Sequence, residues 1–230
     1  TLFRSVVQKL KDAGLKTVQL GIQSHDKNTM TLITNNKSSY DEKIAFAKEV
    51  KEAGLQLIVN TCITRQNIHQ VGEIIEFAEK LGANYLEIAN IQYYGWALKN
   101  VNALLLTQEQ ITKAREVTNY YRKERKDMKV FFVVPDYFAT RPKACMNGLG
   151  TTFLTINPDG VALPCNTANT LPLTFPNVKD FSVEQIWNDS EEFNYFRGDK
   201  WMKEPCRTCD ERDKDFGGCR CQAYAFRRRI

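Results

Sequence analysis

Cysteine spacing is the feature of this chain with the clearest chemistry. Six of its seven cysteines fall in two groups, Cys145-x14-Gly160-x4-Cys165 and Cys206-x2-Cys209-x5-Asp215-x3-Cys219-x-Cys221. Thiolates crowded this closely are typical of metal binding, and a Cys-x2-Cys pair lets two sulfurs reach one metal centre. The last third of the chain is therefore predicted to be a metal-binding domain.

Zinc ions and iron–sulfur clusters both bind such thiolates. Six cysteines and one aspartate exceed the four ligands of a structural zinc ion, whereas two iron–sulfur clusters need about eight. The count favours iron–sulfur clusters, and the alternative is a non-enzymatic zinc module whose cysteines only hold a small fold together. Seven cysteines do not form a closed disulfide framework, so we expect a reducing, cytoplasmic setting.

Composition excludes several classes of function. The 230 residues carry a formal net charge of +5, from 32 basic and 27 acidic side chains, which is too small an excess to argue for nucleic-acid binding. The sequence has no long apolar run, so no membrane partner is expected, and its first residues lack the features of a secretory signal.

Helices and strands must alternate in the first half. A helix–glycine–strand unit recurs as KDAGLKTVQL, KEAGLQLIVN and EKLGANYLEI. Strands are expected at residues 17–22, 55–63, 85–89 and 129–134, and Ser39 with Glu42 predicts a capping box at the start of one helix. Apolar strands separated by helices predict a parallel sheet covered by helices, in either a barrel or a doubly wound arrangement.

The pattern changes after Pro135. A hairpin is expected around Asn157-Pro158-Asp159-Gly160, and residues 181–196 read as one amphipathic helix. The rest of this half is short, cysteine-rich and glycine-containing. We therefore predict two domains, residues 1–134 and 135–230, in the α/β class.

The two cysteine groups resemble the auxiliary-cluster (SPASM) domain of radical S-adenosylmethionine (SAM) enzymes, with aspartate in the place of one cysteine. Within these enzymes, the segments IANIQYYGWA, PDGVALPC and EPCRTCDERDKDFGGCRCQA resemble the enzyme family of pyrroloquinoline quinone biosynthesis. The resemblance runs over nearly the whole chain. It implies that a partial radical SAM (β/α) barrel precedes a small cysteine-rich SPASM domain.

The resemblance also implies ligand sets. One auxiliary cluster, of the [2Fe-2S] type, would be held by Cys145, Cys165, Cys219 and Cys221. A [4Fe-4S] cluster would be held by Cys206, Cys209 and Asp215, with a fourth ligand after Ile230. The Cys-x3-Cys-x2-Cys motif of the SAM-cleaving [4Fe-4S] cluster is absent and is expected before Thr1, so the sequence is interpreted as a fragment that does not cleave SAM by itself.

An activity and partners follow from the same resemblance. The whole enzyme would crosslink a glutamate and a tyrosine of a precursor peptide through a carbon–carbon bond, with a small peptide chaperone and an electron donor such as flavodoxin as partners. Another SPASM peptide maturase is the nearer alternative. No catalytic residue is identified. Gln23 and Ser24, after an expected strand, are candidate SAM contacts, with loop capping as the equal alternative.

Two further interpretations concern residues outside the cysteine groups. Cys62 is expected to be a buried packing thiol in its strand. Tyr93, Tyr94 and Trp96 could line a peptide groove, but packing between the barrel and the auxiliary domain is the favoured interpretation for these aromatic side chains.

Overall fold

The structure, a computed structural model, describes residues 2–124 and 127–227. The chain divides into two compact units, which are described separately. The sheet unit comprises residues 1–91 and 100–135, and the cysteine unit comprises residues 92–99 and 136–230. Residues 92–99 thus group with the cysteine unit, although the sequence pattern assigns them to the first domain. No helix among the described residues is long and apolar enough to cross a membrane.

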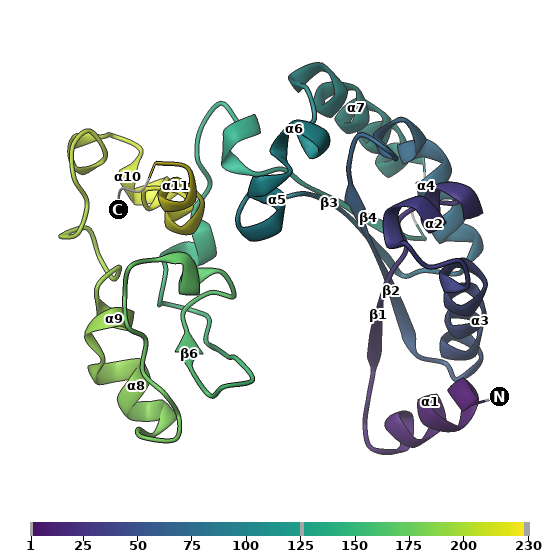
Figure 1. Ribbon diagram of the computed structural model, residues 1–230, viewed down its shortest axis with the longest axis horizontal. Coiled ribbons are helices and arrows are strands. Elements are labelled where there is room, and N and C mark those ends of the chain that lie inside the picture. Colours follow the sequence, from purple (N-terminus) through teal and green to yellow (C-terminus); the bar gives the residue numbers. More distant parts are fainter. Residues whose placement is uncertain (1, 125–126, 228–230) are drawn as a thin grey trace. The chain divides into compact units, whose positions relative to one another are not determined.

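A four-stranded parallel sheet in the order β1-β2-β3-β4 forms the centre of the sheet unit (Figure 1). Its strands are β1 (Thr17–Gly21), β2 (Gln56–Ile63), β3 (Tyr85–Asn90) and β4 (Lys129–Val133). The four expected strands are therefore confirmed, with small differences at their ends. Parallel pairing requires a crossover between neighbours, and the intervening helices supply it.

Helices cover one face of this sheet. They are α1 (Leu2–Asp12), α2 (Lys27–Thr34), α3 (Ser39–Glu52), the 3-10 turn η1 (Ile68–Gln70), α4 (Val71–Lys80), α6 (Val101–Leu104) and α7 (Gln108–Glu124). Leu57, Leu86 and Ile88 on that face are completely buried, as is Ile75 of α4. Burial of each such side chain stabilises the fold by about 1.5–3 kcal/mol, which fixes the strand register.

Two details of the expected helices are wrong. The capping box of Ser39 and Glu42 does not form, because Ser38 and not Ser39 is at the N-cap position of α3. The Ser38 side chain makes no capping bond, and its hydroxyl donates to Asn36 Oδ1. Residues 181–196 form two helices, α8 (Val183–Asp189) and α9 (Glu191–Asn194). Ser190, the residue after α8, separates them with an extended backbone (φ −69°, ψ 136°). Its Oγ donates to the carbonyl of Ile186 in the last turn of α8.

The cysteine unit contains little regular structure. Its elements are α5 (Gly95–Lys99), η2 (Asp136–Phe138), η3 (Cys145–Asn147), β5 (Thr155–Ile156), β6 (Ala162–Leu163), η4 (Ala168–Thr170), α8, α9, η5 (Cys206–Thr208), α10 (Arg212–Asp215) and α11 (Arg220–Arg227). Strands β5 and β6 pair in an antiparallel hairpin, as expected. The apolar core of the cysteine unit includes Ile186, Phe193, Phe196 and Cys221, so one cysteine is part of this interior.

Candidate metal centre

Four cysteine thiols of the cysteine unit lie within hydrogen-bonding reach of one another in pairs. Cys219 contacts both Cys145 and Cys221, and Cys221 also contacts Cys165. Cys145 begins η3, Cys165 follows β6, Cys219 precedes α11, and Cys221 lies in the first turn of that helix. The fold thus brings together the four residues that the family resemblance implies as ligands of one cluster, and their role as ligands stays a prediction.

Gly160 shows why the hairpin before Cys165 requires glycine. Its φ is +92°, and a Cβ there would lie 2.6 Å from Asn177 Oδ1. That amide oxygen accepts from the backbone N–H of Lys179, while its amide nitrogen donates to the Asp159 carbonyl. The glycine of the cysteine spacing therefore closes a turn against an ordered loop, and this turn fixes the path of the chain toward Cys165.

Hydrogen bonds divide the four thiols into two classes. Bonds from Cys145 and Cys221 lower the pKa of the Cys219 thiol to about 3, and a bond from Cys221 lowers the pKa of Cys165 to about 6. The pKa values of Cys145 and Cys221 are raised, first because these thiols donate those bonds and then by burial. Two of the four sulfurs are thereby stabilised as thiolates, which is the form that binds metal.

Pairwise contacts, rather than one central point, join the four thiols. All seven cysteines are free thiols. Within residues 2–124 and 127–227, no three His, Cys, Asp or Glu side chains gather closely enough to hold one metal ion. A zinc site needs four ligands at about 2.3 Å from one point, whereas a cluster distributes its thiolates over several irons. The contacts from Cys145 through Cys219 and Cys221 to Cys165 join all four thiols in pairs.

Asp136 connects the two segments that carry Cys145 and Cys219. Its Oδ1 accepts from the backbone N–H of Lys143 at 3.1 Å, and its Oδ2 accepts from the backbone N–H of Cys219 at 2.9 Å. The second bond spans 83 residues. The cysteine pattern gave no signal for this residue, because the contact is distant in the sequence.

Replacing Asp136 with alanine should loosen both segments. Two charge-assisted hydrogen bonds are lost, so we expect the metal-free protein to lose about 2–4 kcal/mol of unfolding free energy. Asp136→Asn keeps one acceptor oxygen, so its unfolding free energy should lie between those of the parent protein and Asp136→Ala. Urea denaturation measures the change, with Asp213→Ala as the control, since that side chain is 83% exposed. A loss equal to that of the control would contradict the role of Asp136.

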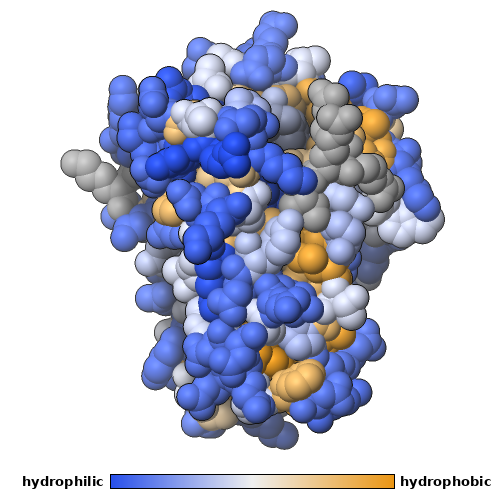
Figure 2. Space-filling model, turned by 90° about the vertical axis from the view of Figure 1, so that its left-hand side faces the viewer, coloured by the Kyte–Doolittle hydropathy of each residue, from blue (hydrophilic) through white to orange (hydrophobic). Residues whose placement is uncertain are grey.

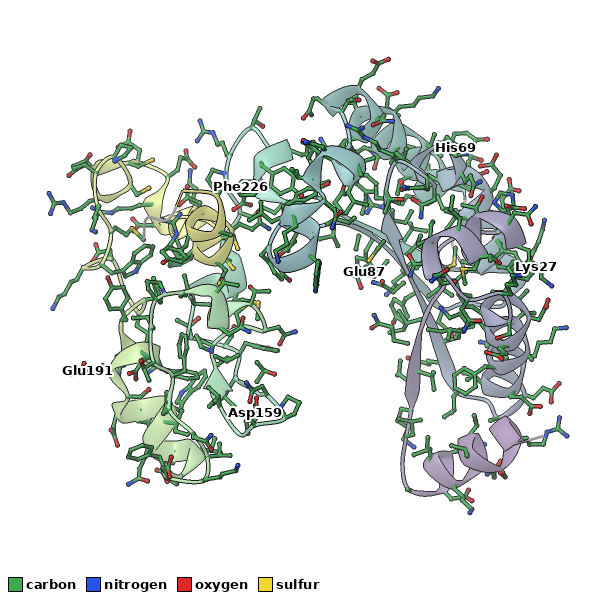
Figure 3. All side chains as sticks on the ribbon, viewed as in Figure 1. Lys27, His69, Glu87, Asp159, Glu191 and Phe226 are labelled. Carbon is green, nitrogen blue, oxygen red and sulfur yellow. The ribbon has the colours of Figure 1, made fainter. Side chains whose placement is uncertain are left out.

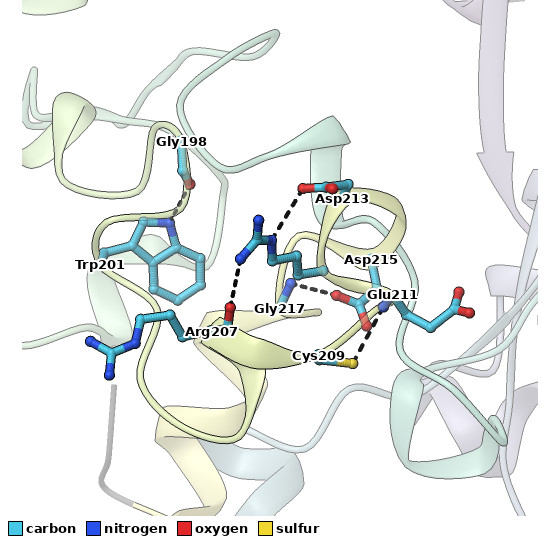
Figure 4. A network of polar contacts seen from close by, with 9 residues as sticks. Gly198, Trp201, Arg207, Cys209, Glu211, Asp213, Asp215 and Gly217 are labelled. Atoms are coloured by element: carbon cyan, nitrogen blue, oxygen red, sulfur yellow. Dashed lines mark hydrogen bonds and ion pairs between the residues drawn. The ribbon is translucent and has the colours of Figure 1, made fainter.

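The second predicted ligand set is less compact. Cys206, Cys209 and Asp215 lie in one loop through η5 and α10, but in the described chain no hydrogen bond joins their side chains. Cys209 Sγ instead accepts from the backbone N–H of Glu211 at 3.4 Å, and Asp215 Oδ1 accepts from that of Gly217 at 2.7 Å (Figure 4). Their assignment to a second cluster stays a prediction.

Gln23 and Ser24 lie at the carboxyl end of the sheet, as expected. Gln23 Oε1 accepts from the backbone N–H of Cys62 at 2.9 Å. Ser24 is fully buried, and its hydroxyl donates to Gln70 Oε1 at 2.6 Å and accepts from the backbone N–H of Asp26 at 2.9 Å. These bonds are those that the loop-capping alternative predicts. Contact with SAM stays a prediction for both residues.

Asn67 holds this edge together. It is fully buried, its Nδ2 donates to the carbonyls of Gln23 and Cys62, and its Oδ1 accepts from the backbone N–H of Thr64. Asn67→Ala leaves these three backbone groups without their partners, so we expect a loss of about 2–4 kcal/mol in unfolding free energy. Thermal unfolding, compared with Asn28→Ala at an exposed position of α2, tests this expectation. Equal midpoints for the two variants would refute it.

The face of the sheet opposite the helices carries polar groups that the sequence reasoning missed. Asn60 Nδ2 donates to Glu87 Oε2 at 3.0 Å, and the two residues are register partners on β2 and β3. Glu87 projects from this side of the sheet (Figure 3). Cys62 is exposed on the same face, so the expectation of a buried packing thiol is wrong. The alternation of side chains along β2 could have predicted this exposure. Leu57 and Val59 face the helices, so Asn60 and Cys62 must face the other side.

The three aromatic residues after β3 have different environments. Tyr93 is 2% exposed, and its ring lies 5.6 Å from that of Tyr137 and 6.5 Å from that of Phe226, both in the same unit. Burial, and then the charges of Cys165, Cys219 and Cys221, raise the pKa of Tyr94. Trp96 is 78% exposed, and packing of these residues between the two domains stays a prediction.

Comparison with known proteins identifies part of the chain. Residues 145–210 match the SPASM family, described as an iron-sulfur cluster-binding domain. The crystal structure of Streptococcus suis SuiB is similar with a TM-score of 0.66 and 18% identity over 89% of this chain and 50% of that one. SuiB bound to precursor peptide SuiA gives the same score and identity, over 89% and 49%.

A second group of structures has the same fold. Native anSMEcpe with bound AdoMet and Kp18Cys peptide matches with a TM-score of 0.68 and 14% identity over 95% of this chain and 63% of that one. The chain therefore spans about half to two thirds of the length of these structures. The predicted α/β class with a parallel sheet is confirmed, and we identify this chain as one with the fold of SuiB and anSMEcpe that carries a SPASM domain at residues 145–210.

Proposed function

We propose that this chain is part of a radical SAM enzyme that modifies a precursor peptide. The observation that carries the proposal is the group of four thiols, Cys145, Cys165, Cys219 and Cys221, the first two of which lie in the stretch that matches the SPASM family. Two of the similar structures support the substrate class, since SuiB is bound to a precursor peptide and anSMEcpe to AdoMet and a peptide.

The finer proposal is an activity like that of PqqE. That enzyme joins a glutamate and a tyrosine of the precursor peptide PqqA through a carbon–carbon bond, and the peptide chaperone PqqD presents the peptide. We extend these partners to the whole protein, together with an electron donor such as flavodoxin and a cytoplasmic location. The support is the resemblance of the cysteine-rich segments, including aspartate at position 215.

Each unit would contribute its own residues. When bound, SAM and the iron–sulfur cluster that reduces it would supply the radical chemistry at the peptide. Asn60, Cys62 and Glu87 would form a polar wall on the uncovered face of the sheet, and Gln23 would present an amide at its carboxyl edge. The four thiols would hold an auxiliary [2Fe-2S] cluster for electron transfer, and Cys206, Cys209 and Asp215 would hold part of a [4Fe-4S] cluster.

Two measurements test the proposal at different levels. After anaerobic reconstitution the protein should be brown and contain iron and acid-labile sulfide, whereas a colourless protein with zinc alone would favour the zinc module. The whole protein, supplied with SAM, a reductant and PqqA, should then yield a peptide lighter by two hydrogen atoms, one taken by the SAM-derived radical and one lost as a proton and an electron. Iron binding with no change in PqqA would instead favour another SPASM peptide maturase.

A further inference from the structure

An acidic segment stands out in this basic protein. Residues 144–196 contain six carboxylates and one lysine, Lys179, whereas the whole chain carries a net charge of +5. Helices α8 and α9 lie in this segment, away from the four thiols in sequence. Apolar side chains are exposed there as well, since Phe181 is 52% and Val183 is 50% exposed. Apolar groups among hydrophilic ones are visible on the face of the molecule drawn in Figure 2.

A groove of about 540 Å³ runs along α8 in this segment. Its floor is apolar and includes Phe175, Phe181 and Ile186. Its walls carry three carboxylates, from Asp180, Asp189 and Glu192, and no lysine, arginine or histidine lines it. In the part of the chain that the structure describes, none of these three carboxylates forms an ion pair. The groove therefore combines an apolar surface with three carboxylates that form no ion pair among the described residues.

Local hydrogen bonds fix the walls of the groove. Ser182 and Gln185 form a reciprocal capping box at the start of α8, with bonds of 2.9 and 3.2 Å. The backbone N–H groups of Asp180 and Phe181 both donate to the Asn177 carbonyl at 3.1 Å. A wall that is ordered before binding loses little conformational entropy when a partner docks, which favours a specific interaction.

We propose that this groove, which we call the α8 groove, docks a peptide segment of a partner protein in which a lysine or arginine stands next to an apolar side chain. The apolar side chain would cover Phe175, Phe181 and Ile186, while the cation would meet the carboxylates. Like charge disfavours phosphate-bearing ligands such as nucleic acids. The surface is not explained by cluster binding, so this inference goes beyond the proposed function and does not depend on it.

Fluorescence anisotropy of a labelled peptide of alternating leucine and lysine, titrated with the whole protein at low salt, tests the proposal. We expect saturable binding that weakens about tenfold in the triple variant Asp180→Asn/Asp189→Asn/Glu192→Gln, as expected for three exposed ion pairs together. Phe181→Ser should also weaken it. A matched triple variant, Asp159→Asn/Glu184→Gln/Glu191→Gln, removes the same charge outside the groove and should bind like the parent protein.

Several results would overturn the proposal. Equal weakening of binding by both triple variants would mean that the attraction is non-specific. Equally tight binding of a peptide with glutamate in place of lysine would show that charge does not select the partner. If sedimentation showed a dimer that only the groove variant dissociates, the occupant would be a second copy of this chain. A photo-crosslinking peptide should label residues 174–192, and labelling elsewhere would refute the site even if a variant failed to fold.

Discussion

Cys219→Ala should abolish iron binding at the four-thiol site. Cys219 makes two of the three contacts that join the four sulfurs, so its loss isolates Cys145 from Cys165 and Cys221. Loss of a direct ligand should exceed the 10–100-fold drop in metal affinity that is typical when only a supporting group is removed. Iron and sulfide content and the visible spectrum after anaerobic reconstitution measure this effect.

The control for this experiment is Cys62→Ser. Cys62 is an exposed thiol on β2 in the sheet unit, and it is not one of the predicted cluster ligands. Its replacement should therefore leave iron, sulfide and spectrum unchanged. Full retention of iron in Cys219→Ala would show that the four thiols are not the metal centre. The α8 groove shares no lining residue with this site and is tested by its own variants.

Gly218→Ala should have the second large effect, on stability. Gly218 has φ +69°, and a Cβ there would lie 2.7 Å from Pro142 Cβ and 3.0 Å from Asp136 Oδ2. The left-handed conformation costs a non-glycine residue about 1–2 kcal/mol, and overpacking adds about 1–3 kcal/mol. We therefore expect a loss of about 3 kcal/mol in the unfolding free energy of the metal-free protein, together with weaker iron retention because Cys219 must shift.

Gly198→Ala separates the two causes. Gly198 has nearly the same φ, +73°, but a Cβ there would meet nothing within 4 Å. The variant should lose only the conformational term of about 1–2 kcal/mol and retain its iron. Denaturant unfolding of both variants gives the comparison. If the two lose the same free energy, the close approach of Gly218 to Pro142 and Asp136 does not constrain the ligand loop.

Local patterns were sufficient for the strands. β2 and β3 are short, apolar and bounded by glycine-terminated helices, so their type followed from residues close together in the chain. The broken helix at Ser190 shows where such patterns fail. Residues 181–196 keep a helical apolar period, but the hydroxyl of Ser190 competes for the Ile186 carbonyl and ends α8 early.

The sequence by itself determined the parallel α/β sheet, the hairpin around Gly160 and the cysteine groups, because each depends on local spacing or on side-chain chemistry. Only the tertiary structure decided that Cys145, Cys165, Cys219 and Cys221 meet, that Asp136 joins two of their segments, and that Cys62 is exposed rather than buried. The physical reason is that these properties depend on contacts between residues far apart in the chain. Such contacts are set by how whole segments pack, and the order of residues within one segment does not encode them.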